Sequence, residues 1–165
     1  MLTMNRRLAI ASALASGLAT LTANTAASSA TMAASQDGLV RNRSVYPFAE
    51  TIVRLKADIA KKGIVFFSAI DQAKLASDAK VSLRPSTLLM FGNPALGSQF
   101  ITSNPNAGID WPVRLLVQED EQGQVWTVYT DFDWIAERYK ITNRAAAFAM
   151  ASKVIASITS SVANK

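Results

Sequence analysis

The chain has 165 residues, of which half are hydrophobic and 18% are charged, and this composition indicates one folded domain and argues against a disordered chain. It contains no cysteine and no histidine, which excludes disulfides, thiol chemistry, histidine-based catalytic triads and His-ligated zinc or haem. The net charge of +5 comes from scattered Lys and Arg residues without a long basic cluster, so nucleic-acid binding is not expected.

The first thirty residues have the order of a secretory signal peptide. Arg6 and Arg7 precede a mildly apolar run at 8–21, and small residues follow. That run is about 14 residues long, fewer than the roughly 20 that cross a bilayer as a helix. We therefore predict a cleavable signal peptide at 1–30, a disordered linker at 31–38 and a periplasmic or secreted mature protein. The export route and the cleavage site stay open.

The first half of the mature chain alternates strands and helices. We expect a strand at 39–46 and a helix at 47–63, where apolar residues recur every three or four positions and Gly63 ends the helix. Residues 64–70 are rich in β-branched and aromatic side chains, which predicts a buried strand. A short helix with an aspartate as its N-cap is expected at 71–80.

The second half adds a strand, a hairpin and two helices. Residues 86–91 are nearly all apolar, so their strand should lie in the middle of a sheet. Residues 113–130 predict a hairpin around an acidic, glycine-containing turn, and Asp131 then caps a helix. A long amphipathic helix is expected at 142–165, covering either the core or a partner. Attachment to a membrane surface through 143–162 is a further hypothesis, weakened by the scarcity of Lys and Arg on its polar side.

This order of elements predicts a two-layer α+β domain over residues 39–141. It should hold a small, mostly antiparallel sheet with helices packed on one face, and the long C-terminal helix follows it. The acidic cluster at 119–123 is the candidate for a carboxylate metal site, but it is too short and lacks the spacing of a calcium loop. We therefore expect a hairpin turn there, with no metal and no cofactor.

The sequence FGNP at 91–94 ends the central strand and starts another helix. As a turn it needs nothing more, because Gly92 allows a positive φ, Asn93 caps the helix and proline fits the first turn. The alternative is an anion site at the helix N-terminus, completed by Arg84 or Arg114. A phosphate loop would require more glycine and a lysine, which favours the turn.

Aromatic residues are frequent between residues 66 and 134, where they either fill the core or line an apolar ligand pocket. We expect most of them in the core. The set consists of Phe66, Phe67, Phe91, Trp111, Trp126, Tyr129 and Trp134. Asp110, before Trp-Pro, is predicted to be a structural carboxylate that closes a loop against a backbone amide. As a lone acid without a nearby partner in the sequence, it is a poor candidate for general acid-base catalysis.

Three stretches, at 50–79, 83–101 and 109–139, together resemble the family called domain of unknown function 302. They carry Glu50-Thr51 at a helix start, the FGNP corner, Asp110 to Pro112, and Gly123 through Trp126 to Tyr129. The resemblance covers about residues 48 to 140 and leaves out the C-terminal helix. It implies a small α+β fold, often secreted in bacteria, with no established activity.

The chain departs from the family pattern at two places. It has Asp71-Gln72 where members commonly have Asp-His, and Phe100 or Ile101 where they have Met. If the family histidine serves metal or proton chemistry, this chain has lost that chemistry. If the histidine is a cap or a core contact, nothing is lost.

These observations favour a secreted, non-enzymatic module that binds a small anionic or apolar ligand or a partner protein, as a homodimer. One alternative is an enzyme acting on a small anionic substrate through Asp110, Arg114 and Tyr129. Attachment to a membrane surface is not expected. No catalytic residue is assigned, and the candidate ligand-binding residues are Arg84, Phe91, Gly92, Asn93, Asp110, Arg114 and Tyr129.

Overall fold

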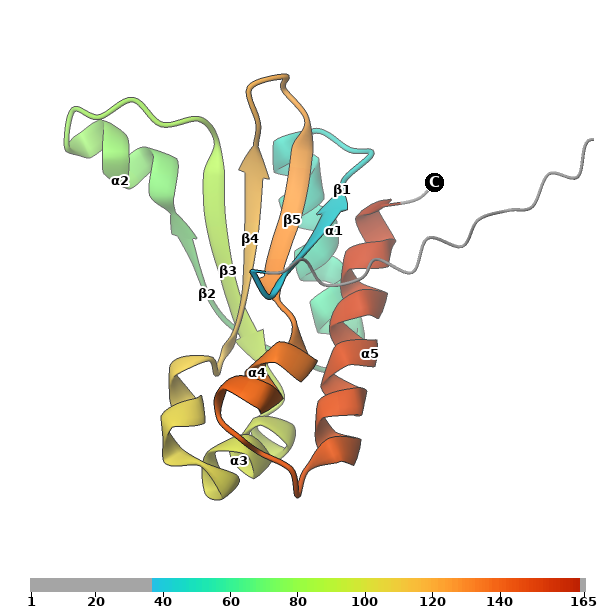
Figure 1. Ribbon diagram of the computed structural model, residues 1–165. Helices are drawn as coiled ribbons and strands as arrows, with labels where there is room; N and C mark the ends of the chain where they lie inside the picture. Colours follow the sequence, from blue (N-terminus) through green and yellow to red (C-terminus); the bar gives the residue numbers. More distant parts are fainter. Residues whose placement is uncertain (1–36, 164–165) are drawn as a thin grey trace, which may run out of the picture. The chain divides into compact units, whose positions relative to one another are not determined.

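The computed structural model describes residues 37–163 (Figure 1). The predicted signal peptide and residues 31–36 of the predicted linker lie outside the described residues. Residues 37 and 38 of that linker form a turn, in which the Asp37 carboxylate accepts a hydrogen bond from the Leu39 backbone N–H at 3.0 Å.

The described chain forms one antiparallel five-stranded sheet with the strand order β1-β5-β4-β3-β2. This confirms the predicted α+β class and places the strand of residues 86–91 inside the sheet, paired on both sides. The strands are β1 (Leu39–Arg43), β2 (Val65–Asp71), β3 (Ser86–Gly92), β4 (Val113–Glu119) and β5 (Val125–Thr130).

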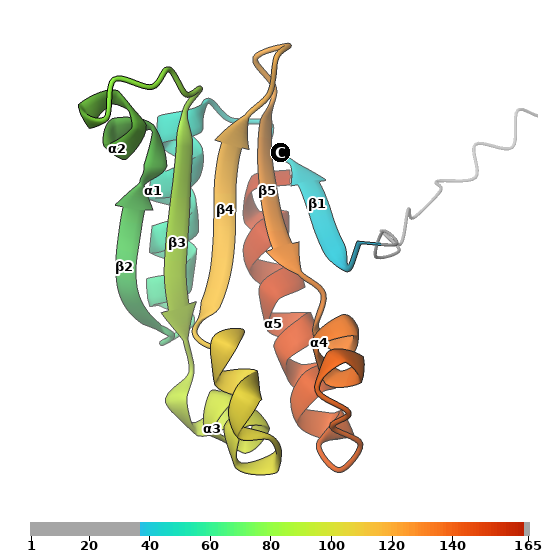
Figure 2. The ribbon, with the colours of Figure 1, turned by 60° about the vertical axis from the view of Figure 1, so that its left-hand side comes forward.

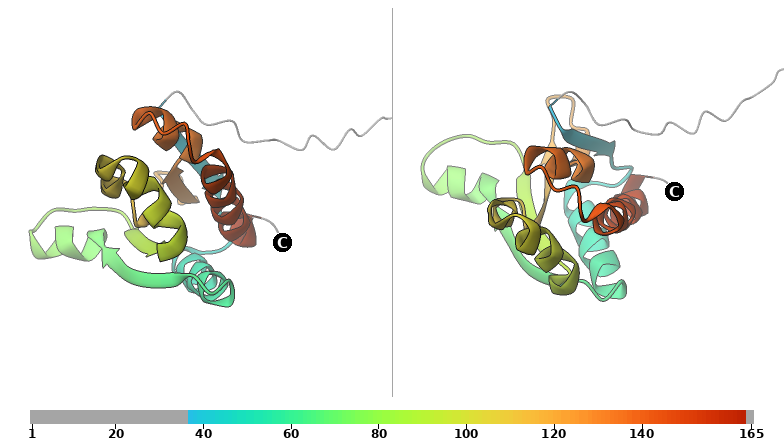
Figure 3. Two further views of the ribbon diagram at one scale, coloured as in Figure 1. Left: turned by 90° about the horizontal axis from the view of Figure 1, so that it is seen from below. Right: turned by 60° about the horizontal axis from the view of Figure 1, so that its bottom comes forward.

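The helices take three positions around this sheet. Helices α1 and α5 cover one face, whereas the other face carries no helix (Figure 2). Helices α3 and α4 lie beyond one end of the sheet, next to α5 (Figure 3), and α2 projects near the other end. Their bounds are α1 (Phe48–Lys61), α2 (Gln72–Asp78), α3 (Pro94–Ser103), a 3₁₀ turn η1 (Pro105–Ile109), α4 (Phe132–Arg138) and α5 (Ala145–Ala163).

Local sequence signals set the ends of the helices as predicted. The carboxylates of Asp71 and Asp131 accept hydrogen bonds from backbone N–H groups three residues later, at 2.8 and 2.9 Å. The amide oxygen of Asn93 does the same for α3 at 3.2 Å. Gly63 follows α1 with φ of 66°, a conformation that glycine adopts without steric cost.

The core lies between the sheet and the pair α1 and α5. Alternate residues of the central strands point toward these helices, and Leu89, Leu115 and Thr127 are fully buried. Leu55 of α1 and Ile158 of α5 are also fully buried, and the two helices pack on each other. The apolar stripe predicted for α1 therefore faces this core.

Strand β2 differs from the prediction of a buried strand. It is an edge strand, and Val65 and Phe67 are 45% and 44% exposed. β-branched and aromatic residues suit any pleated surface, so their presence cannot distinguish an edge strand from a central one.

Helix α5 covers the core and is not a spare helix beside the domain. Seven of its residues are buried, and the ring of Phe148 stacks on that of Phe100 in α3 with centroids 4.2 Å apart. Among the described residues, α5 is the helix long and apolar enough to cross a membrane by length and composition. Its apolar side is used in packing within the domain.

Candidate functional site

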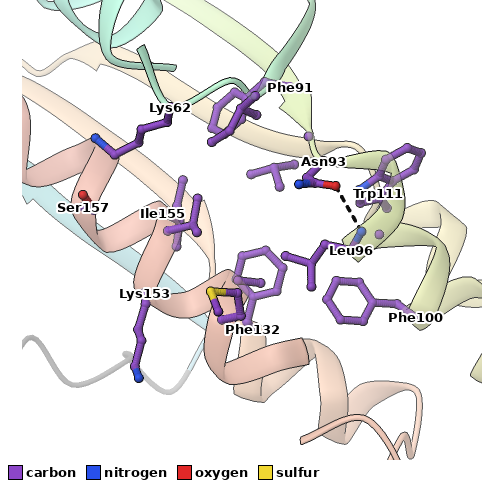
Figure 4. A pocket seen from close by; sticks show the side chains of 17 residues that line it. Lys62, Phe91, Asn93, Leu96, Phe100, Trp111, Phe132, Lys153, Ile155 and Ser157 are labelled. Carbon is purple, nitrogen blue, oxygen red and sulfur yellow. Dashed lines mark hydrogen bonds between the residues drawn. The ribbon is translucent and has the colours of Figure 1, made fainter. Parts of the chain in front are cut away.

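A cavity of about 390 Å³ opens where β3 ends and α3 begins, between these elements and α5 (Figure 4). Strand β3 leads into it through Phe91 and Gly92, and α5 lines it through a face that includes Ala151 and Ile155. The end of α1, the start of β4 and the start of α4 contribute Lys62, Val113 and Phe132. Six segments of the chain therefore meet at one site.

Aromatic and aliphatic side chains form most of the wall. Phe91, Phe100 and Ile155 are 1%, 3% and 2% exposed, so the deep part of the cavity belongs to the packed core. Met150 of α5 is 54% exposed and lies on the open side. The polar side chains along the wall are those of Lys62, Asn93, Lys153 and Ser157.

Trp111 closes the cavity against α3, and two glycines make room for its indole ring. A Cβ atom on Gly97 would lie 1.9 Å from Nε1 of Trp111, and one on Gly92 would lie 3.1 Å from the same atom. The expectation of a positive φ at Gly92 is wrong, because the positive-φ glycines of the described chain are elsewhere. Close approach of the indole, and not a turn conformation, is what favours glycine at both positions.

The FGNP corner uses most of its hydrogen-bond donors within the turn. The backbone N–H groups of Leu96 and Gly97 both donate to the carbonyl oxygen of Asn93, and the side-chain oxygen of Asn93 also accepts from Leu96. Pro94 has no N–H group. The geometry therefore favours the turn interpretation over an anion seat on the α3 N-terminus.

Two polar donors at the cavity have no hydrogen-bond partner among the described residues. They are Nε1 of Trp111 and Nδ2 of Asn93. Lys153 forms no ion pair within the described chain, whereas Lys62 pairs with Asp58 one helical turn earlier. The cavity thus has an apolar interior, with hydrogen-bond donors and positive charge at its edges.

The structure separates the predicted site residues into three places. Phe91, Gly92 and Asn93 line the cavity. Arg84 lies beyond the opposite end of β3, about 20 Å away for a seven-residue strand, and pairs with Glu121 at 3.1 Å. It does not reach the corner.

Asp110 is the centre of a separate charged cluster. Its carboxylate is 5% exposed and binds the guanidinium groups of Arg114 at 2.6 Å and Arg138 at 3.3 Å. The hydroxyl of Tyr139 donates to it at 2.6 Å. This contact raises the pKa of Tyr139 above its ordinary value, chiefly because the phenol must remain protonated to donate to the carboxylate. The partners of Asp110 are side chains from β4, α4 and the residue after α4, and not the backbone amide that the sequence led us to expect.

Asp110, Arg114 and Tyr129 border a second hollow of about 460 Å³, near the uncovered face of the sheet. Burial raises the pKa of Tyr129. Both oxygens of the Asp110 carboxylate are already engaged, so this carboxylate is poorly placed to act as a general base. The hollow also contains Asp37, so that Asp37 and Asp110 together balance the charges of the two arginines.

Sequence reasoning missed several cavity residues and included others that lie elsewhere. Of the seven aromatic residues singled out, Phe91 and Trp111 line the cavity, and they are joined by Phe100 and Phe132. Gln72, where the family commonly has histidine, lies at the start of α2 and accepts a hydrogen bond from Ser86 at 2.7 Å. That departure therefore does not touch the cavity.

Fold and site together define a small two-layer α+β domain with an apolar, partly cationic cavity. The sequence model of the family described as "Domain of unknown function DUF302" matches residues 40–158. The chain belongs to this family. The match extends into α5, beyond the stretch that carried the resemblance.

A solved structure and three curated proteins are similar to the chain. The crystal structure of an uncharacterized conserved protein DUF302 from Bacillus stearothermophilus superimposes with a TM-score of 0.69 at 15% identity, covering 76% of this chain and 98% of that one. It supports the fold alone. "Fluoride-specific ion channel FluC 1" of Brucella suis and "Fluoride-specific ion channel FluC 2" of Brucella melitensis are each 36% identical over 104 residues, which is 63% of this chain. The chain spans 41% and 38% of their lengths, respectively.

Proposed function

We propose that the protein is exported and works as a non-enzymatic binding protein, whose ligand is a small molecule with an apolar body held in the cavity between β3, α3 and α5. The cavity itself is the observation that carries this proposal. Its volume of about 390 Å³ lies within the range of small-molecule sites, which are concave, mostly apolar and provided with a few placed polar groups.

Two features indicate a preformed site and not a packing defect. The deep wall consists of side chains that are otherwise fully packed, such as Phe91 and Ile155, so the empty space is held open by the core. Glycine at position 97 leaves space for Trp111, because a Cβ atom there would lie 1.9 Å from the indole nitrogen. An apolar ligand gains about 25 cal/mol for each Å² of apolar surface that it removes from water.

A neutral fluorescent probe, N-phenyl-1-naphthylamine, tests this proposal. Saturable binding by the wild-type protein is expected, and Val154→Phe should weaken it at least tenfold because Val154 lines the cavity. Val53→Phe is the matched control, since Val53 lies on α1 with 66% exposure and does not line the cavity. If the wild-type protein shows no saturable binding, or if Val154→Phe binds as well as wild type, the cavity is not the site.

A second copy of the chain is the partner that we propose for the uncovered sheet face. Leu88 and Leu116 pair across β3 and β4 on this face and are half-buried. The neighbouring hollow holds both charge signs, so two identical faces can meet without net repulsion. Light scattering should give twice the chain mass, and Leu116→Lys should give a monomer while Val53→Lys should not. A monomeric wild-type protein would contradict this assembly.

The catalytic and transport alternatives have weaker support. An enzyme built on Asp110 would need a free carboxylate, and this one is saturated by Arg114, Arg138 and Tyr139. The curated relatives carry the name of a fluoride-specific ion channel, but the chain covers about two fifths of their length. We therefore assign neither turnover nor ion conduction to this domain.

A further inference from the structure

We infer that the ligand of the cavity is an acidic amphiphile, such as a medium-chain carboxylate, an inference that rests on the binding function proposed above. The charges around the cavity point to this class. Its lining includes two lysines, Lys62 and Lys153, and no aspartate or glutamate. A cavity with an apolar interior and cationic side chains at its edge is complementary to a molecule with an apolar chain and an anionic head group.

The lysines lie together on one side of the cavity. Lys153 and Ser157 are one turn apart on α5, and Lys62 caps the C-terminus of α1, the helix that packs on α5. In Figure 4 these three side chains lie along one side, opposite Phe100 and Trp111. Both ammonium groups point outward from the cavity edge, in different directions.

Lys153 is the stronger candidate for the head group. It forms no ion pair with any described residue, so its charge is available to a ligand. Lys62 is paired with Asp58 and adds positive potential without a fully free ammonium group. The electrostatic contribution should be moderate, because contacts of exposed ammonium groups are screened by water and salt.

The volume of the cavity bounds the length of the apolar chain. A water-sized group occupies about 30 Å³ in a liquid, so a cavity of 390 Å³ holds roughly 13 such groups. A ten-carbon acid fits this estimate. Affinity should rise by up to about fourfold with each added methylene until the cavity is full, and should then level off.

Competition between decanoate and the neutral alcohol decanol for the N-phenyl-1-naphthylamine site tests the inference. Decanoate should displace the probe at about three- to tenfold lower concentration than decanol in low salt. The advantage should largely disappear in about 1 M salt, where the screening length falls to about 3 Å. It should also be lost when Lys62→Gln and Lys153→Gln are combined. The control is Lys61→Gln, which removes a single adjacent charge that does not line the cavity and should keep the preference.

The outcomes distinguish this inference from the function on which it rests. If the probe itself fails to bind, the proposed binding function is wrong. If the probe binds and decanol competes as well as decanoate, the cavity binds apolar molecules but the acidic class is wrong. If the Lys61→Gln control loses the preference as fully as the double variant, overall charge and not the cavity rim is responsible, and the assignment of the lysines fails.

Discussion

The carboxylate of Asp110 bonds to side chains of β4, α4 and the residue after α4. Asp110→Ala should therefore lower the free energy of unfolding by about 3 kcal/mol. The hydrogen bond from the Tyr139 hydroxyl, at 2.6 Å to a buried carboxylate, should contribute about 1.5–3 kcal/mol. The ion pairs with Arg114 and Arg138 add at most about 1 kcal/mol each, because these side chains are 43% and 45% exposed. For a domain of this size, the loss corresponds to a fall in Tm of about 10 °C.

Urea unfolding of a double-mutant cycle measures the contribution of the central contact. Tyr139→Phe alone should lower the free energy of unfolding by about 1.5–2 kcal/mol. The loss in the double variant with Asp110→Ala should be smaller than the sum of the two single losses by at least about 1 kcal/mol. Glu121→Ala is the control, because it removes an exposed carboxylate that is paired with Arg84 at 3.1 Å. It should cost less than about 0.5 kcal/mol.

Two results would refute this account of the Asp110 cluster. The first is a loss below about 1 kcal/mol for Asp110→Ala, which would mean that water replaces all its partners. The second is additivity within about 0.5 kcal/mol between Asp110→Ala and Tyr139→Phe, which would mean that their contact carries no stability of its own.

Three further changes test the packing and the caps. Gly97→Ala gains about 1 kcal/mol of helix propensity but places a methyl group 1.9 Å from the Trp111 indole. We therefore expect a net loss of stability of about 1 kcal/mol and a shift in tryptophan emission. Higher stability with unchanged emission would contradict the contact. The raised pKa of Tyr139 gives stability that is present below pH 10.0 and is lost as pH rises through the folded-state pKa. In thermal melts from pH 9 to about 12, the Tm of Tyr139→Phe should therefore fall less than that of the wild-type protein. Asn93→Ala removes the cap of α3 and should cost about 1 kcal/mol in urea unfolding, and a neutral result would show that the cap contributes nothing.

Local elements were predictable because their causes lie within a few residues. Asp71, Asn93 and Asp131 cap their helices as expected, since a capping side chain needs only the N–H group two or three positions later. The 3.6-residue period of apolar residues in α1 likewise predicted which side of the helix is buried, including Leu55. The hairpin of β4 and β5 followed from its turn.

The order of the strands depended on pairing between distant segments. β2 and β3 have similar apolar composition, but β3 has neighbours on both sides and β2 is an edge strand. Two partners of Asp110, Arg138 and Tyr139, also come from far along the chain, whereas Arg114 lies four residues away in β4. The signal peptide, the periplasmic or secreted location and the ligand stay predictions.

From the sequence alone came the α+β class, the helix caps, the family resemblance and the lack of imidazole and thiol chemistry. Only the tertiary structure brought Phe91, Trp111 and Lys153 around one cavity and placed Arg84 at the far end of β3. Periodicity and capping act over about four residues, whereas a cavity exists only where several packed segments leave a space between them.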